Sequence, residues 1–320
     1  MENPIIQLNG LSKHYGSKKA VENLSLKINK GEIFGLLGPN GAGKTTTILM
    51  MLGLSEPTSG EALVCGINAT NNPIAVKRKV GYMPDNVGFY DNMTALENLM
   101  YIGRLSGIPE EKIAVKARET MELVGLGDEL YKKTGAYSRG MKQRLALADL
   151  LIREPEVMIL DEPTLGIDPA GIKEFLVLIR QLSRQQGLTV LLSSHHLHQM
   201  QQICDRVGIF VEGQLLMEGN IDTLSGNLFG KESYVIQVTV REPLANAQAL
   251  QQELQQLEHV NKAATSEYGV ELSCSQDITP DIVRFFVHKG LNVTGVQKKE
   301  YGLDEIYQRF FENNAKKHVQ

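Results

Sequence analysis

A glycine-rich stretch, GPNGAGKTT at 38–46, combines residue types that suit phosphate binding. It fits the pattern G-x-x-x-x-G-K-[ST] and stands between an apolar run and a helical run. Glycines let a backbone wrap closely around phosphate oxygens, and the N–H groups of the loop and of the next helix point at the anion. We expect Lys44 to reach the β- and γ-phosphates of a nucleotide and the Thr45 hydroxyl to bind Mg²⁺. The expected cofactor-binding residues of this loop are Gly38, Pro39, Asn40, Gly41, Ala42, Gly43, Lys44, Thr45 and Thr46.

Two adjacent carboxylates supply what this loop lacks. Asp161 and Glu162 end the apolar run VMILDEP (157–163), which indicates a buried strand. A carboxylate at a strand end suits Mg²⁺ held through water, so Asp161 is a predicted metal residue. Glu162 is placed to polarise an attacking water and is the predicted general base. In the alternative interpretation the two acids only cap the next helix, and the phosphate loop is no more than a glycine turn.

A third stretch, YSRGMKQR at 137–144, places a hydroxyl, a glycine and three cations at the start of a predicted helix, LALADLLIRE. Ser138 and Gly140 flank Arg139 in this stretch. Such a helix start offers backbone N–H groups and positive charge to an anion. The residues alone leave open which anion this is and whether the same chain holds it.

The composition excludes several classes of protein. The 320 residues include 33 Lys and Arg against 37 Asp and Glu, a net charge of −4, so we expect no nucleic-acid partner. The three cysteines lie far apart without a CxxC pair, which indicates reduced, buried thiols in a cytoplasmic protein. The start, MENPIIQLNG, has no signal-peptide pattern, and no uncharged apolar run approaches the roughly 18 residues of a membrane span. We therefore expect about two domains and no membrane crossing.

Strand and helix patterns alternate through the first two thirds of the chain. GEIFGLLG (31–38) and LTVLLSSH (188–195) indicate buried strands, whereas KTTTILMMLGL (44–54) and AGIKEFLVLIRQLSRQQG (170–187) indicate helices. This alternation predicts an α/β fold with a mainly parallel sheet that is covered on both faces. We assign residues 1–225 to this domain.

The segment at about 86–136 differs from its surroundings because it is helical throughout. Thr94 and Glu97 stand in capping-box spacing at the start of TALENLMYIGRLSG, and Pro109 with two acids begins the next helix. We expect a helical insert in the sheet domain. Just before the capped helix, Phe89, Tyr90 and Met93 form an apolar cluster on a predicted loop, which is either an edge of the core or a docking patch.

The C-terminal third has its own pattern. SGNLFGKES predicts a linker over 226–233, and residues 234–320 follow in the order strand, helix, strand, strand, helix, strand. The second helix, DIVRFFVHKG, is expected to be capped by Thr279–Pro280 and is followed by a last strand and a short helix. This order predicts a small ferredoxin-like α+β accessory domain. No catalytic constellation is recognisable in it, and we expect it to pair or regulate subunits.

Several motifs occur together in a characteristic order, and on them the chain resembles the nucleotide-binding subunit of an ABC transporter over about residues 4–220. Besides the phosphate loop and the acidic strand end, TLGIDP and LLSSH match the family, and YSRGMKQR stands in place of the signature LSGGQ. The resemblance implies a P-loop NTPase cassette with an antiparallel β subdomain and a helical insert. It also implies an ATPase that converts ATP and water to ADP and phosphate, with ATP and Mg²⁺ as cofactors.

The resemblance implies further roles for single residues. Tyr15 corresponds to the aromatic that stacks on adenine, and His195 to the switch histidine that contacts the γ-phosphate, here a predicted catalytic residue. Asp168 lies in the loop that reaches a second cassette, which we take to be a second copy. The signature residues Ser138, Arg139 and Gly140 are then expected to bind the ATP held by that second cassette. A separate multi-span permease would hold the pair at the cytoplasmic face of the membrane.

Three positions depart from the family pattern. In GYMPD the usual glutamine is Asp85, and in the signature Arg139 replaces a glycine and Met141 a glutamine. We expect Asp85 to act near the γ-phosphate as a catalytic residue and to face Mg²⁺ or its water shell. This variant signature resembles exporters for drugs, antibiotics and bacteriocins, whose ATPase pairs with a separate short permease of the ABC-2 type.

Other functions remain as alternatives at this stage. An importer ATPase with a regulatory C-terminal domain is one, and a non-transport ATP-dependent regulatory or clamp protein is another. Importers usually keep the glutamine and an LSGGQ-like signature, so Asp85 and Arg139 favour export. The close spacing of His195, His196 and His198 suggests a transition-metal site, although adjacent side chains on a helix diverge.

Overall fold

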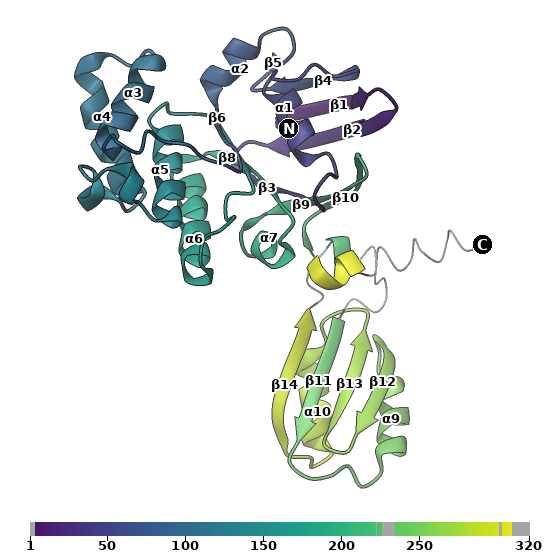
Figure 1. Ribbon diagram of the computed structural model, residues 1–320. Coiled ribbons are helices and arrows are strands. Elements are labelled where there is room, and N and C mark those ends of the chain that lie inside the picture. The colour runs from purple at the N-terminus through teal and green to yellow at the C-terminus, as the bar shows by residue number, and fades with distance from the viewer. Residues whose placement is uncertain (1–3, 222, 226–233, 301–302, 309–320) are drawn as a thin grey trace. The chain divides into compact units, whose positions relative to one another are not determined.

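The computed structural model describes residues 4–221, 223–225, 234–300 and 303–308 (Figure 1). The chain divides into two compact units, Met1–Glu218 and Gly219–Gln320. The expected boundary at residue 225 falls inside the second unit, and the expected linker 226–233 lies outside the described residues.

A six-stranded sheet in the order β10-β9-β3-β8-β7-β6 forms the centre of the first unit. Its strands β9, β3, β8, β7 and β6 pair in parallel. Every residue of β3, β7 and β8 is buried, which explains their continuous apolar runs, since helices or a second sheet cover both faces. The bounds are β3 (Ile33–Leu37), β6 (Val80–Met83), β7 (Val157–Asp161), β8 (Thr189–Ser194), β9 (Arg206–Val211) and β10 (Gln214–Gly219).

A second sheet, in the order β2-β1-β4-β5, is antiparallel. The helix α1 (Lys44–Met51) contributes Ile48 and Met50 to a core shared with this sheet and with Phe34 and Phe210 of the parallel sheet. The phosphate loop is thus held between two sheets by the helix that follows it. The strands are β1 (Pro4–Tyr15), β2 (Lys18–Asn29), β4 (Ser59–Val64) and β5 (Ile67–Asn68).

The helical insert contains α3 (Ala95–Leu105) and α4 (Glu110–Leu123), followed by the 3₁₀ turns η1 (Gly127–Glu129) and η2 (Thr134–Ala136). The expected capping box is present, because the Thr94 side chain accepts from the Glu97 N–H and the Glu97 side chain accepts from the Thr94 N–H. Pro109 is the N-cap of α4 rather than its first residue. The two ends of the insert meet at a bridge between Thr94 and Lys133.

The described part of the first unit has four more helices: α2 (Pro73–Lys79), α5 (Arg139–Leu151), α6 (Pro169–Gln186) and α7 (Leu197–Ile203). The Ser138 hydroxyl caps α5 by accepting from the Met141 N–H, and Asp168 caps α6 by accepting from the Gly171 N–H. At its other end α6 stops at Gly187, whose φ of 65° is left-handed. None of the described helices is long and apolar enough to span a bilayer.

The second unit has the predicted ferredoxin-like order. Its strands β11 (Tyr234–Val240), β12 (Val260–Ser266), β13 (Gly269–Cys274) and β14 (Val293–Glu300) pair antiparallel in the order β12-β13-β11-β14. The helices α9 (Ala247–Gln255) and α10 (Thr279–His288) supply Leu250, Leu254, Ile282 and Phe286 to one core. Residues 303–308 are helical, and the rest of the expected last helix lies outside the described residues.

One expected cap in this unit is wrong. Thr279 is the first residue of α10, and its hydroxyl donates to the Asp277 carboxylate at 2.7 Å instead of accepting from the helix. The Asp277 carboxylate also accepts from the Thr279 N–H at 3.1 Å, so the aspartate two residues earlier supports the helix start.

Candidate nucleotide site

The phosphate loop follows β3, and two of its glycines are required by close backbone contacts. A Cβ added at Gly38 would collide with the carbonyl oxygen of Phe210, and one at Gly43 with that of Ala20. Gly43 also has a φ of 107°, which disfavours any other residue. The turn that aims the loop at the start of α1 therefore depends on glycine at both positions.

The Lys44 side chain is buried, with 6% of its surface exposed. Its ammonium donates to the Gly38 carbonyl at 2.6 Å and to the Pro39 carbonyl at 3.1 Å, and lies 3.7 Å from the Glu162 carboxylate. Burial lowers the pKa of Lys44, and the charges of Glu162 and Asp161 oppose that shift. The loop and the acidic pair thus hold the cation in the position that a phosphate would need.

Asp161 ends β7 and is 3% exposed. Its carboxylate accepts from the Thr45 hydroxyl at 2.8 Å on one oxygen and from the Ser193 hydroxyl on the other. The sequence reasoning brought Thr45 and Asp161 together correctly but missed Ser193, which comes from the neighbouring strand β8. The signal was the pair of serines in LLSSH, the first of which is in register with Asp161 at the end of β7.

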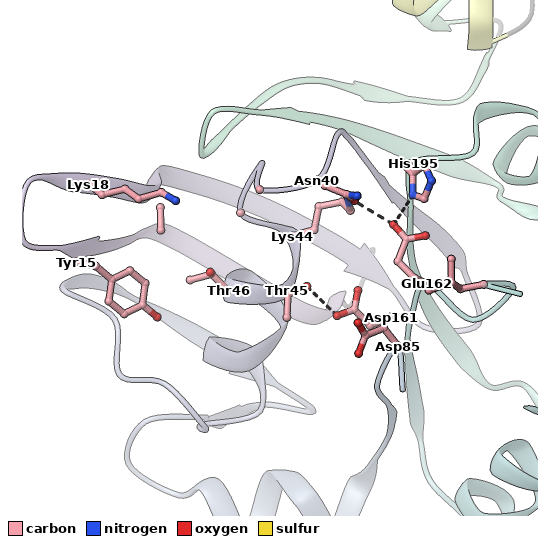
Figure 2. Close-up of a pocket in the computed structure, with 14 residues that line it drawn as sticks. Tyr15, Lys18, Asn40, Lys44, Thr45, Thr46, Asp85, Asp161, Glu162 and His195 are labelled. Carbon is pink, nitrogen blue, oxygen red and sulfur yellow. Dashed lines mark hydrogen bonds and ion pairs between the residues drawn. The ribbon is translucent and has the colours of Figure 1, made fainter. Parts of the chain in front are cut away.

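Glu162 leaves the strand with a φ of 47°, a left-handed value that is uncommon for a glutamate. Its N–H still bonds to the Ser193 carbonyl at 3.0 Å, so the side chain turns away from the strand into the pocket. There the carboxylate contacts His195 Nδ1 at 2.9 Å and accepts from the Ser194 hydroxyl at 3.4 Å. Glu162, His195 and Lys44 therefore form one connected group (Figure 2).

These groups line a cavity of about 380 Å³. Tyr15 and Lys18 stand at one end of it and Glu162 and His195 at the other (Figure 2). Asp85 also lines it, and burial together with the charges of Asp161 and Asp85 raises the pKa of Tyr82 to about 12. The lining residues are Tyr15, Lys18, Ala20, Asn40, Gly41, Gly43, Lys44, Thr45, Thr46, Asp85, Asp161, Glu162, Leu165 and His195.

This lining agrees with most of the expected residues and adds a few. Gly38, Pro39 and Ala42 belong to the loop but are absent from the lining. Lys18, Ala20 and Leu165 were not expected. Lys18 follows the hairpin turn after Tyr15, a position that only the pairing of β1 with β2 brings to the cavity.

Tyr15 is 52% exposed at the end of β1. The Lys13 ammonium lies 5.1 Å from the centre of its ring and donates to the Glu56 carbonyl at 2.6 Å. An anchored cation thus stands over the ring, and a flat apolar surface of this kind suits a base that stacks on it.

The signature residues are not part of this cavity. Ser138, Gly140 and Asp168 line a second cavity of about 360 Å³, together with Ile167, Arg144 and residues of α6. Arg139 lines neither cavity, and its side chain lies over Gly166, where an added Cβ would be 2.5 Å from Nε. The chain therefore presents the phosphate loop and the signature at separate places.

A transition-metal site at the histidine cluster receives no support. The rings of His195 and His196 lie with their centres 4.0 Å apart and their planes tilted by 39°, and His198 contacts Gln202 on the next turn of α7. Within the described ranges, no three or more His, Cys, Asp or Glu residues converge on a point where they could hold a metal ion.

Comparison with known proteins gives the family. A family model described as ABC transporter matches residues 21–165. The bacitracin transport ATP-binding protein BcrA of Bacillus licheniformis is 46% identical over 220 residues, which cover 69% of this chain and 71% of that protein. The linearmycin resistance ATP-binding protein LnrL of Bacillus subtilis is 33% identical over 307 residues, 95% of this chain and 97% of that protein. The chain belongs to the ATP-binding subunits of ABC transporters.

A solved structure agrees with this ABC assignment. The cbiO1 subunit of Clostridium perfringens, part of the ABC transporter complex cbiONQ, is 26% identical and superposes with a TM-score of 0.64 over 68% of this chain and 89% of that chain. The predicted P-loop cassette fold is thus confirmed, and the chain is an ABC ATPase. ABC ATPases of transporters act in pairs and reach the membrane through a permease.

Proposed function

We propose that two copies of this chain stack head to tail, close on two ATP molecules and drive export of a substrate through a separate multi-span permease. The observation that carries this proposal is the separation of the two cavities. Ser138 and Gly140 line one and Lys44 lines the other, so a single chain offers two half-sites. A signature turned outward at the start of α5 suits the γ-phosphate of a nucleotide that a second copy holds.

The coupling to transport follows from binding energy. ATP bridges the two copies, which favours the closed pair, and hydrolysis removes the bridge. Because the nucleotide has different affinity for the closed and the open pair, its binding and loss shift the permease between two states. The pair sits peripherally at the cytoplasmic face of the membrane, held by the permease.

Each residue of the ATP site has a proposed role. Tyr15 stacks on adenine, and the loop N–H groups with Lys44 hold the β- and γ-phosphates. Glu162 polarises the attacking water, and His195, 2.9 Å from it, keeps its carboxylate in place and contacts the γ-phosphate. Asp168 contacts the other copy beside the signature.

The site also fits Mg²⁺. The Thr45 hydroxyl and the Asp161 carboxylate, 2.8 Å apart, are the hard oxygen ligands that this ion prefers. Thr45 and Asp161 would hold the ion, with Asp85 facing its water shell. When bound, Mg²⁺ would neutralise charge on the phosphates.

The relatives support the direction of transport. One is named for bacitracin transport and another for linearmycin resistance, and a transporter that confers resistance would carry the toxic compound out of the cell. The departures at Asp85 and Arg139 point the same way. We therefore favour export over import, with a permease of the ABC-2 type as the partner.

Permease docking is proposed for the surface of Phe89, Tyr90 and Met93. Tyr90 and Met93 are 53% and 36% exposed, and Phe89 is half-buried. The Tyr90 backbone is fixed, since its N–H donates to Asn98 and its carbonyl accepts from Thr134. Exposed apolar side chains on a rigid backbone suit an interface. A groove of about 910 Å³ between α2 and the insert is lined by other residues, among them Ile74, Lys77, Arg78, Leu105 and Lys112.

A double replacement tests this docking surface. Changing Phe89 and Tyr90 to alanine should abolish transport by the complete transporter while ATP hydrolysis by the isolated subunit stays close to native. Loss of the folded state, seen as a lower melting temperature, would instead place both side chains in the core.

For the domains, we propose a cassette over 1–225 and an accessory domain over 234–320 that pairs or regulates subunits. A chain that ends at residue 225 should still bind ATP, because every residue that lines the ATP cavity precedes that point. A folded but non-binding product would show that the C-terminal unit contributes to the site.

A mixing experiment tests the head-to-tail pair. Glu162→Gln and Ser138→Arg should each be inactive alone, but in a mixed dimer one site joins an intact Glu162 to an intact Ser138. At equal amounts about half of random pairs are mixed, so about a quarter of native ATPase activity should return if the two sites act independently. No recovery, with mixed dimers shown to form, would contradict the arrangement.

A further inference from the structure

The ATP cavity carries more acidic than basic side chains. Asp85, Asp161 and Glu162 line it, against Lys18 and Lys44. The Asp161 carboxylate already accepts hydrogen bonds from Thr45 and Ser193. The Glu162 carboxylate already contacts Lys44 and His195. Asp85 is exposed and, within the described part of the chain, accepts no hydrogen bond and forms no ion pair. A triphosphate adds negative charge beside it, and a bound Mg²⁺ would offset only part of that charge. The cavity therefore favours a further cation, one that the described residues of this chain do not bring to it.

The signature turn carries a cation of this kind. Arg139 is exposed, and among the described residues its guanidinium has no hydrogen bond or ion pair. The side chain nevertheless packs against the Gly166 turn, since a Cβ added at Gly166 would lie 2.5 Å from Nε and 2.6 Å from Cζ. Gly166 has a φ of 74°, which fixes the turn that supports the guanidinium. A side chain that packs against a turn loses less freedom than a fully extended one when it binds a carboxylate or phosphate.

The other cations of the signature helix are already engaged. Lys142 pairs with Asp91 at 3.0 Å, and Arg144 donates to Glu174 at 2.9 Å and to the Val124 carbonyl at 3.1 Å. Arg139 is thus the cation of this helix start that is left for a partner, and it stands next to Ser138.

We propose that Arg139 of one copy pairs with Asp85 of the other copy, beside the γ-phosphate, and that this pair offsets the excess negative charge of the closed ATP site. The inference rests on the proposed head-to-tail dimer, which brings the signature of one copy to the ATP cavity of the other. It also explains why two departures from the family pattern occur in one chain: an added acid in the cavity is matched by an added base in the signature. Arg139 is then a positioning residue for closure.

The pair makes a specific prediction for a double-mutant cycle. Arg139→Gly should leave Asp85 unpaired beside the phosphates and raise the KM for ATP by at least about tenfold, because losing one partner of a desolvated interfacial pair costs more than losing an exposed one. ATP-dependent dimerisation of a Glu162→Gln background should weaken in parallel. Asp85→Gln combined with Arg139→Gly removes both charges and should restore KM and dimerisation most of the way to native values.

Three further variants separate charge from structure. Arg139→Lys keeps the charge and should retain most of the ATP affinity, whereas Arg139→Gln keeps most of the packing over Gly166 and should lose it. Lys142→Ala is a matched control on the same helix, because Lys142 pairs with Asp91. Its effect on the KM for ATP should be the same whether position 85 is aspartate or glutamine. Thermal unfolding of each variant without nucleotide should change little, because Arg139 is exposed.

Two outcomes overturn the pair. One is that Arg139→Gly leaves the KM for ATP and the dimerisation unchanged. The other is that the KM of the double variant rises by the product of the increases measured for Arg139→Gly and Asp85→Gln alone. The mixing of Glu162→Gln with Ser138→Arg is measured alongside. If ATPase activity recovers on mixing but the effects of Arg139→Gly and Asp85→Gln are additive, only the Arg139–Asp85 pair is refuted. If no activity recovers, the head-to-tail dimer itself is refuted.

Discussion

Replacing Glu162 by glutamine removes one negative charge from the ATP site and keeps the shape of the side chain. The native carboxylate is 13% exposed and is held 2.9 Å from His195 and 3.7 Å from Lys44, so it is already oriented before any water arrives. A general base contributes about 10²–10⁴-fold to a rate. With this degree of orientation we expect a loss in kcat near the upper end, about 10³–10⁴-fold or about 4–5 kcal/mol in barrier.

Binding of ATP should survive the same change. Lys44 keeps its bonds to the Gly38 and Pro39 carbonyls and loses an anion that competes with phosphate. The affinity for ATP should therefore stay at its native level or increase.

The assay pairs phosphate release at saturating ATP with equilibrium binding of a fluorescent ATP analogue. Glu156→Gln is the matched control, since Glu156 precedes the same strand β7 and pairs with Lys79 at the far end of it. Hydrolysis at a near-native rate in Glu162→Gln would refute the assignment of the base. Equal loss in both variants would point to a general effect on β7.

Three other replacements test separate parts of the structure. Gly38→Ala should abolish ATP binding, because the new Cβ collides with the Phe210 carbonyl, whereas Gly88→Ala, in open space, should not; calorimetric titration distinguishes the two. Leu254→Ala, at a fully buried position, should destabilise the C-terminal unit by about 2–5 kcal/mol in denaturant unfolding and leave ATP hydrolysis unchanged. Burial raises the pKa of the Cys65 thiol to about 11, so at pH 8 only about a thousandth of it is thiolate and alkylation should be slow, speeding up as the pH rises towards 11; rapid labelling of the folded chain at pH 8 would contradict this.

The residues of the cavity that the sequence already brings together are those with a local cause. The glycines, Lys44 and Thr45 are adjacent in the chain, and a strand before the loop and a helix after it are sufficient to place them. The bounds of α6 also follow from local signals, Asp168 at its start and Gly187 at its end. The ferredoxin-like order follows because few sheets accommodate that sequence of strands and helices.

The residues that sequence reasoning missed depend on pairing between distant strands. Ser193 reaches Asp161 only because β7 and β8 run in parallel register, and Lys18 reaches the cavity only through the β1–β2 hairpin. The antiparallel sheet itself came from the family resemblance, since the alternation of the two long strands is interrupted by register shifts. The left-handed backbone of Glu162 also has no local signal, because the surrounding strands impose it.

The bridge between Thr94 and Lys133 has a consequence for chain entropy. The residues between them form a closed loop whose ends are tied by backbone hydrogen bonds, such as Thr134 N–H to the Met93 carbonyl at 3.0 Å. The free energy of closing a loop grows only with the logarithm of its length, about 0.6 kcal/mol for each doubling. Residues added at the turn between α3 and α4 should therefore add little to the free energy of closing this loop. This position suits a reporter peptide or a fluorescent label that leaves β6 and β7 in register.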